Sequence, residues 1–82
     1  STKNSSDPSV TFYSSSWKSS TIKKPTESIA SFVSGYALTN QYEDFAESLV
    51  FYVFHNRMFE DRAMKNDSMR QKYLFFQKYL FS

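Results

Sequence analysis

The alternation of apolar and polar residues predicts one long amphipathic helix over residues 40–55. At about 100° per residue, its apolar side chains fall in one broad sector, whose members are Tyr42, Phe45, Ala46, Leu49, Val50, Tyr52 and Val53. Asp44, Ser48 and His55 lie on the opposite side of this projection, which we expect to face water. Glu43 does not lie on this polar side. It falls between the apolar Val50 and Phe54 on the projection, each about 20° away. A carboxylate in such a position needs a cation or hydrogen-bond donors.

Local signals also set the ends of this helix. Asn40 is a favourable N-cap residue, and Glu43 follows three residues later, where the acid of a capping box would stand. The triplet His55-Asn56-Arg57 is expected to end the helix or to fray it. These signals come from neighbouring residues and are independent of the rest of the chain.

A second amphipathic helix is expected near the end of the sequence. Ser68-x-x-Gln71 has the spacing of a capping box, and an apolar face at helical spacing accompanies it, consisting of Met69, Tyr73, Phe76 and Leu80. Residues 57–67 are charged and predict a turn or a short helix, with Met58 and Phe59 as its anchors. The two longer helices should pack against each other as a helical hairpin.

The beginning of the chain has a different composition. Residues 1–24 hold nine serines and only three aromatic residues, so we expect a serine-rich extended or loop segment rather than a helix. Residues 26–34 are compatible with a short helix, although Ser-Phe-Val-Ser also alternates as a strand would. The face of that short helix would consist of Ile29, Phe32, Val33 and Tyr36. The expected fold class is therefore mainly α, with an irregular N-terminal segment.

Composition limits the classes of function. A chain of 82 residues supports one small domain, which buries about 60% of the surface that its unfolded form exposes. The net charge is +2, and the longest positive run is the pair Lys23-Lys24, so neither nucleic acid nor a membrane is expected as a partner. The absence of cysteine excludes disulfides and thiolate metal sites and leaves the redox compartment undetermined.

A motif covers the start of the predicted main helix. Residues 36–47 read Tyr-Ala-Leu-Thr-Asn-Gln-Tyr-Glu-Asp-Phe-Ala-Glu and fill every fixed position of the pattern Tyr-x-x-Thr-Asn-x-x-Glu-x-Phe-Ala-Glu. This pattern resembles the third-ligand segment of the gluzincin zinc metallopeptidases, most closely the branch that includes the catalytic domain of anthrax lethal factor. The resemblance extends over residues 32–81 and implies that residues 25–82 are the helical C-terminal part of a zincin-like catalytic domain.

The resemblance implies a role for three residues. In such enzymes two histidines of a His-Glu-x-x-His helix and a downstream glutamate hold zinc, while a tyrosine faces the reacting carbonyl. Glu43, and not its neighbour Asp44, would be the inward acid and the glutamate ligand. Tyr36 would be the tyrosine that stabilises the transition state. Glu47 would accept the free N–H of a ligand histidine.

The chain contains no His-Glu-x-x-His sequence. Its one histidine, His55, follows Glu43 by twelve residues, so on one helix the two lie about 18 Å apart along the axis. They cannot share the ~2 Å bonds of one zinc ion. The resemblance therefore implies a fragment of a larger peptidase that binds zinc only with histidines from the N-terminal remainder of its catalytic domain. Alone it should be inactive on peptide or protein substrates, and a secreted or cell-envelope location is favoured.

Each of these roles has a simpler alternative. Glu43 could serve only as a capping-box acid, favoured by the helix dipole. Tyr36 could be an aromatic anchor, and Glu47 could be a solvated acid or the partner of Arg57 or a lysine. For the whole chain, the alternative is a non-catalytic helical module that binds a protein partner through its aromatic surface. Membrane-surface binding is disfavoured, because the polar helix faces lack dense lysine and arginine.

Overall fold

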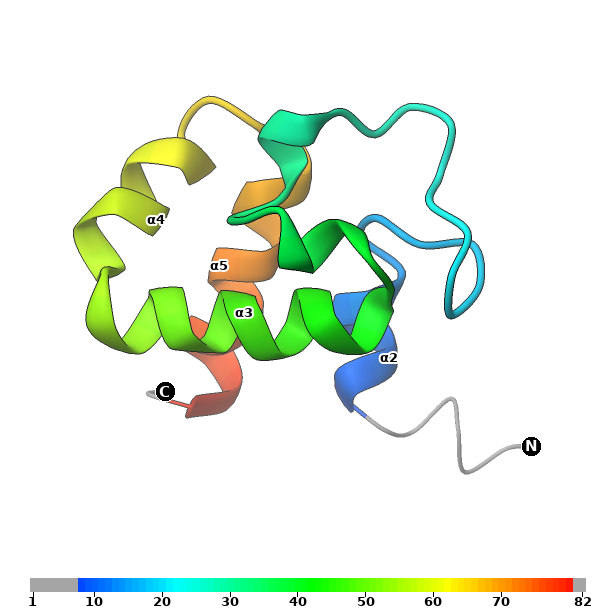
Figure 1. Ribbon diagram of the computed structural model, residues 1–82. Coiled ribbons are helices and arrows are strands. Elements are labelled where there is room, and N and C mark those ends of the chain that lie inside the picture. Colours follow the sequence, from blue (N-terminus) through cyan, green and yellow to red (C-terminus); the bar gives the residue numbers. More distant parts are fainter. Residues whose placement is uncertain (1–7, 81–82) are drawn as a thin grey trace.

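The computed structural model describes residues 8–80, which form four α-helices and two short 3-10 helices (Figure 1). In chain order these are α2 (Pro8–Tyr13), η1 (Ile29–Ser31), η2 (Tyr36–Leu38), α3 (Gln41–Phe54), α4 (Asn56–Ala63) and α5 (Asp67–Leu80). The described part of the chain contains no β-strand, only an isolated antiparallel bridge between Trp17 and Lys23. The fold class is mainly α, as the sequence predicted.

Helix α3 begins and ends where its local signals predict. The backbone of Asn40 is extended, and its Oδ1 accepts the N–H groups of Tyr42 at 3.0 Å and Glu43 at 2.9 Å. Both bonds satisfy donors that the first turn of a helix otherwise leaves free. At the other end, His55 leaves the helical conformation with φ −135° and ψ 47°. Helix α4 then starts at Asn56, so the break predicted at residues 55–57 is a sharp bend between two helices.

The predicted face of the last helix is largely confirmed, whereas its start is wrong. Met69, Tyr73 and Phe76 are buried, but Leu80 is about half exposed. The N-cap is Asn66, whose Oδ1 accepts the Met69 N–H at 2.9 Å. Ser68 does not cap α5, because its hydroxyl donates to a distant carboxylate instead. Of the two anchors expected before this helix, Phe59 is buried in α4 and Met58 is exposed.

The core lies where α3 and α4 pack against α5, which passes behind α3 in Figure 1. The ring of Tyr52 in α3 lies 5.1 Å from that of Tyr73 and 5.5 Å from that of Phe76. Phe59 of α4 approaches Tyr73 edge-on at 5.5 Å. Each aromatic pair of this kind adds about 0.5–1.5 kcal/mol beyond the burial of its surface. The predicted packing of the two long helices is thereby confirmed.

The prediction of a loop at the start of the chain is wrong in part. Residues 8–13 form helix α2, which begins with a proline in a position where its missing N–H is not needed. Phe12 of this helix is buried, with its ring 5.0 Å from Phe45 and 5.4 Å from Phe76. Trp17, in the irregular stretch that follows, is buried as well. The segment belongs to the core, and the part of the prediction on residues 1–7 lies outside the described residues.

The segment between residues 26 and 40 is mostly irregular. The short helix predicted over residues 26–34 is reduced to the single turn of η1, after which Phe32 is extended with φ −128° and ψ 144°. Phe32 is buried, but Ile29 and Tyr36 are 77% and 74% exposed. The four apolar residues therefore do not form one helical face. None of the helices within residues 8–80 combines the length and apolarity needed to cross a membrane.

Candidate functional site

Helix α3 is turned about its axis relative to the sequence prediction. Asp44, Ser48 and Tyr52 are its buried residues, whereas Val50 and Val53 are each about half exposed. On the helical projection this inward direction differs from the predicted one by roughly a third of a turn. The expectation that Asp44 and Ser48 face water is wrong. Asp44 is the inward acid of the helix, and the prediction that Glu43 takes this position is also wrong.

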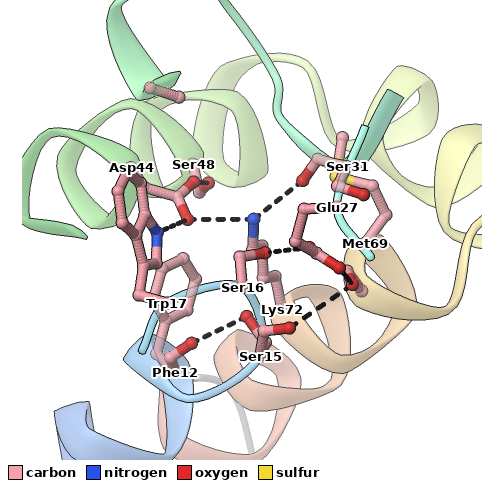
Figure 2. Close-up of polar contacts among 12 residues, drawn as sticks. Phe12, Ser15, Ser16, Trp17, Glu27, Ser31, Asp44, Ser48, Met69 and Lys72 are labelled. Carbon is pink, nitrogen blue, oxygen red and sulfur yellow. Dashed lines mark hydrogen bonds and ion pairs between the residues drawn. The ribbon is translucent and has the colours of Figure 1, made fainter. Parts of the chain in front are cut away.

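Asp44 is held in the core by three donors from three parts of the chain. Figure 2 shows its carboxylate directed toward the ammonium of Lys72 in α5, with Asp44 Oδ2 2.9 Å from Lys72 Nζ. The indole Nε1 of Trp17 donates to the same Oδ2 at 3.0 Å. Ser48, one turn further along α3, donates its hydroxyl to Oδ1 at 3.1 Å. Both side chains of the ion pair are fully inaccessible to solvent.

Lys72 has further partners of its own. Its Nζ donates to the carbonyl of Ser31 at 2.7 Å. The ammonium also lies 4.1 Å from the ring centroid of Phe32 and 5.8 Å from that of Phe12, within the range of a cation–π interaction. Every fully buried side-chain nitrogen and oxygen in the described residues has a hydrogen-bond partner. The pair is therefore fully satisfied, which is the condition under which buried charges are tolerated.

Burial dominates the titration of this pair. It raises the pKa of Asp44 above the ordinary value. The positive charge of Lys72 and the hydrogen bonds from Lys72, Trp17 and Ser48 oppose this rise. Burial likewise lowers the pKa of Lys72, against the attraction of Asp44 and Glu27. Both directions show that the charged forms are desolvated. We therefore expect the pair to fix the position of α3 on α5 more than it adds net stability.

A second buried polar contact adjoins the first. Glu27 accepts the hydroxyl of Ser16 at 2.5 Å and, through its other oxygen, the hydroxyl of Ser68 at 2.9 Å (Figure 2). These three residues come from the irregular segment, the residues before η1 and the first turn of α5. Ser68 also lies 3.4 Å from the carbonyl of Ser15. The contact attaches the N-terminal segment to the last helix.

The predicted zinc ligand lies on the other side of α3. Glu43 is exposed, and its backbone N–H bonds to the Asn40 side chain. Its carboxylate forms no hydrogen bond or ion pair with any residue in the range 8–80. The reciprocal bond of a capping box, from the Asn40 N–H to Glu43, is thus not formed. The alternative role of Glu43 is therefore limited to its favourable charge in the first turn of α3.

The two other predicted site residues are Glu47 in α3 and Tyr36 in η2, two elements that the Ser34 side chain connects. Glu47 is half-buried, and its Oε1 accepts the hydroxyl of Ser34 at 2.9 Å. Ser34 in turn accepts the N–H of Ala37, which places η2 against α3. Tyr36 precedes Ala37 in η2 and is 74% exposed. Tyr36 is therefore not a core anchor, and Glu47 has no ion pair with a cation of the described chain.

The outward residues of α3 form a continuous row, which we call the outer stripe: Glu43, Glu47, Val50 and Phe54. Their spacing of i, i+4, i+7 and i+11 puts them on one side of the helix. Phe54 is 75% exposed and Val50 is about half exposed. The stripe therefore joins two carboxylates to apolar side chains that the described residues do not cover.

A complete metal site is not assembled by the described residues. Within residues 8–80, no three His, Cys, Asp or Glu side chains converge closely enough to hold a metal ion. His55 is exposed at the bend between α3 and α4, with its ring 5.3 Å from that of Phe51. A zinc ion at Glu43 would need nitrogen ligands from outside these residues.

No protein-family model, curated protein or solved structure matches the chain. The function therefore has to be inferred from the residues and from their geometry.

Proposed function

We propose that the chain supplies the third-ligand segment of a gluzincin-type zinc metallopeptidase. Glu43 is the zinc ligand of this proposal, Tyr36 stabilises the transition state, and Glu47 orients a ligand histidine. The remainder of the catalytic domain supplies the two histidines and the general base. Without that remainder the chain does not hydrolyse peptide or protein substrates.

The observation that carries the proposal is the opposite placement of two neighbouring acids. Asp44 uses its carboxylate inside the chain, on Lys72, Trp17 and Ser48. Glu43 points outward, and its carboxylate has no partner among the described residues. A carboxylate left free beside an apolar surface is available to a metal ion that arrives with another segment.

The chemistry of the donor set fits a catalytic zinc. One glutamate and two histidines partly neutralise the dication and leave one position open for water or substrate. The zinc ion supplies a water activated near neutral pH and polarises the peptide carbonyl. The phenol of Tyr36, free at the surface, is suited to donate to the oxyanion that forms on that carbonyl.

Glu47 fits a supporting role. Its Oε1 is held by the Ser34 hydroxyl, which fixes the carboxylate while the other oxygen has no partner among residues 8–80. A carboxylate in this position, one turn from the ligand, can accept the second ring N–H of a metal-bound histidine. The exposed Val50 and Phe54 of the outer stripe then offer an apolar surface for the helix that carries the histidines.

The test uses the complete protein. Glu43→Ala should strip the zinc, measured by elemental analysis of dialysed protein, because one of three protein ligands is lost. Tyr36→Phe should keep the zinc and lower kcat by roughly 100- to 1000-fold, as removal of an oxyanion donor does elsewhere. Glu60→Ala, an exposed acid of α4, is the matched control and should change neither quantity. Full zinc retention by Glu43→Ala would refute the ligand assignment.

One observation favours the alternative, a non-catalytic helical interaction module. The described chain closes a core of its own, in which every fully buried side-chain polar atom has a partner. A segment torn from a larger domain should aggregate or melt without cooperativity. Circular dichroism and sedimentation of the 82-residue chain distinguish the two candidates. Cooperative melting of a lone monomer, together with no His-Glu-x-x-His sequence upstream of Ser1 in the parent gene, would support the module.

A further inference from the structure

We propose that a cavity between residues 29–38 and the end of α4 binds a small apolar carboxylate. The cavity has a volume of about 420 Å³, within the range of small-molecule sites. Its floor is formed by the buried side chains of Phe32 and Val33, and the exposed Ile29 lies at its rim. The lining is therefore mostly apolar, which suits an alkyl or aryl group.

The charge of the lining is of one sign. Of the described residues that border the cavity, the charged ones are Arg62 and Lys65, and none is acidic. Arg62 is held in place, because its Nη1 donates to the Val33 carbonyl at 3.1 Å and its guanidinium lies 5.6 Å from the ring of Phe51. No carboxylate within residues 8–80 forms an ion pair with Arg62. A fixed guanidinium with free N–H groups is well suited to bind a carboxylate.

Lys65 adds a second cation that is free to move. Its Nζ lies 3.8 Å from Asp61, and both side chains are largely exposed. An exposed pair of this kind contributes little, so Lys65 can turn to a ligand at small cost. The two cations together favour an anion at the mouth of the cavity over a neutral ligand.

The remaining polar groups favour a ligand without amides. The Ser34 hydroxyl donates to Glu47 and accepts the Ala37 N–H. The Asn66 side chain donates to Ser31 and accepts the Met69 N–H. These neutral groups are already engaged, so the amides of a peptide would lose water without gaining partners there. An alkyl carboxylate has no such groups, and we therefore assign the site to it rather than to a peptide terminus.

The cavity is distinct from the three residues of the proposed zinc site, and its nearest connection to them is the hydrogen bond from Ser34 to Glu47. None of Tyr36, Glu43 and Glu47 lines it. Binding at the cavity can therefore be measured directly, on the complete protein or on the 82-residue chain if that chain melts cooperatively, without a readout of zinc or of peptidase activity. The inference stands or falls independently of the proposed function.

The probe is octanoate, titrated into the ¹⁵N-labelled chain and followed by NMR, with octanamide as the neutral ligand of the same length. Amide shifts should concentrate in residues 29–38 and 62–66, and octanoate should bind at least fivefold more tightly than octanamide. Lys65→Gln should weaken octanoate alone, by roughly two- to fivefold. Lys78→Gln, which removes an exposed lysine from α5, is the charge-matched control and should have no effect.

A second variant tests the location. A side chain at Gly35 would meet no atom within 4 Å of its Cβ, and the backbone there is right-handed helical with φ −62°. Because Gly35 lines the cavity, Gly35→Phe adds a bulky side chain at its wall without disturbing the core, and should weaken both ligands more than tenfold. Unchanged binding in this variant, equal affinity for the two ligands or no shift at millimolar octanoate would overturn the inference. Tighter binding of acetyl-glycyl-leucine than of octanoate would also overturn it, in favour of a peptide terminus.

Discussion

The inner and outer sides of α3 carry two acids that are adjacent in sequence but differ in their burial and in their partners. Asp44 is fully buried and bonded to Lys72, whereas Glu43 is exposed and its carboxylate has no partner among the described residues. Adjacent residues on a helix point about 100° apart, so one step along the chain separates them. The comparison shows that the helix is positioned by one acid and leaves the other available for binding.

The two sides should differ most in how mutation changes stability. Asp44→Ala leaves the buried ammonium of Lys72 without its counter-charge, and we expect the free energy of unfolding to fall by about 3–5 kcal/mol. Glu43→Ala removes an exposed acid from the first turn, with an expected loss of at most about 1 kcal/mol. Urea unfolding followed by circular dichroism measures both values. Equal losses would show that α3 is not positioned by Asp44.

Removing both charges together should be far less harmful than removing one. In Asp44→Leu/Lys72→Met the two desolvated charges are replaced by apolar side chains, a change that is often neutral or stabilising. The Trp17 indole loses its acceptor in this variant as it does in Asp44→Ala, and only the Ser31 carbonyl loses a further partner. We expect the unfolding free energy of the double variant to exceed that of Asp44→Ala by about 3 kcal/mol or more. A double variant as unstable as the single one would mean that the ion pair itself stabilises the fold.

Trp17→Phe should have an intermediate effect. The substitution keeps an aromatic ring in the core but removes the indole donor to Asp44, and hydrogen bonds to charged groups contribute about 1.5–3 kcal/mol. Lys23→Gln is the control, because the Lys23 ammonium lies 5.2 Å from the same ring and its hydrogen bond to the Leu38 carbonyl is exposed to solvent. Its loss should lower stability by about 1 kcal/mol or less. If both variants unfold at the same urea concentration, the indole N–H is not important for the fold.

The smallest expected effect is a dependence on pH. Because burial raises the folded pKa of Asp44 above 3.8, the unfolded chain releases this proton first as the pH rises. The contribution of Asp44 to the unfolding free energy should therefore decrease from pH 3.8 up to the folded pKa. Urea unfolding between about pH 3.5 and pH 6 should show this slope in the wild type and not in Asp44→Asn. A carboxyl ¹³C titration of Asp44 with its midpoint at or below 3.8 would contradict the direction.

The features that the sequence predicts well are those set by nearby residues. The Asn40 cap and the end of α3 at His55 depend on side chains within a few positions. The buried face of α5 repeats at helical spacing, so Met69, Tyr73 and Phe76 are identified by pattern alone. Leu80 follows the same pattern and is exposed, because α5 extends beyond the helices that cover its first turns.

The rotation of α3 could not be predicted in this way. The burial of Asp44 depends on Trp17 and Lys72, which are 27 residues before it and 28 residues after it. No local signal connects them. Tyr42, Val50 and Val53 belong to the predicted buried sector but are about half exposed or more in the described chain, so they turn the predicted inward direction the wrong way. A hydrophobic pattern identifies apolar surface but not the segment that covers it.

For the functional sites too, some features can be predicted from the sequence and others are visible only in the folded chain. The motif identifies Tyr36, Glu43 and Glu47 by their spacing, and the described structure adds that Tyr36 and Glu43 are exposed and that Ser34 holds Glu47. The cavity beside Arg62 has no signature in the sequence, because its two walls are about 30 residues apart. Only the folded chain brings them together.

The central claim is that Asp44 positions α3 while Glu43 binds zinc. Its most direct test is the zinc content per chain of two variants of the complete protein. We expect Glu43→Gln to lose the metal, while its unfolding curve stays that of the metal-free wild type. The double variant Asp44→Leu/Lys72→Met should keep the metal, because it changes only the inner side of α3 and the residue of α5 that faces it. Full zinc content in Glu43→Gln, or loss of zinc in a folded double variant, would contradict this assignment of the two acids.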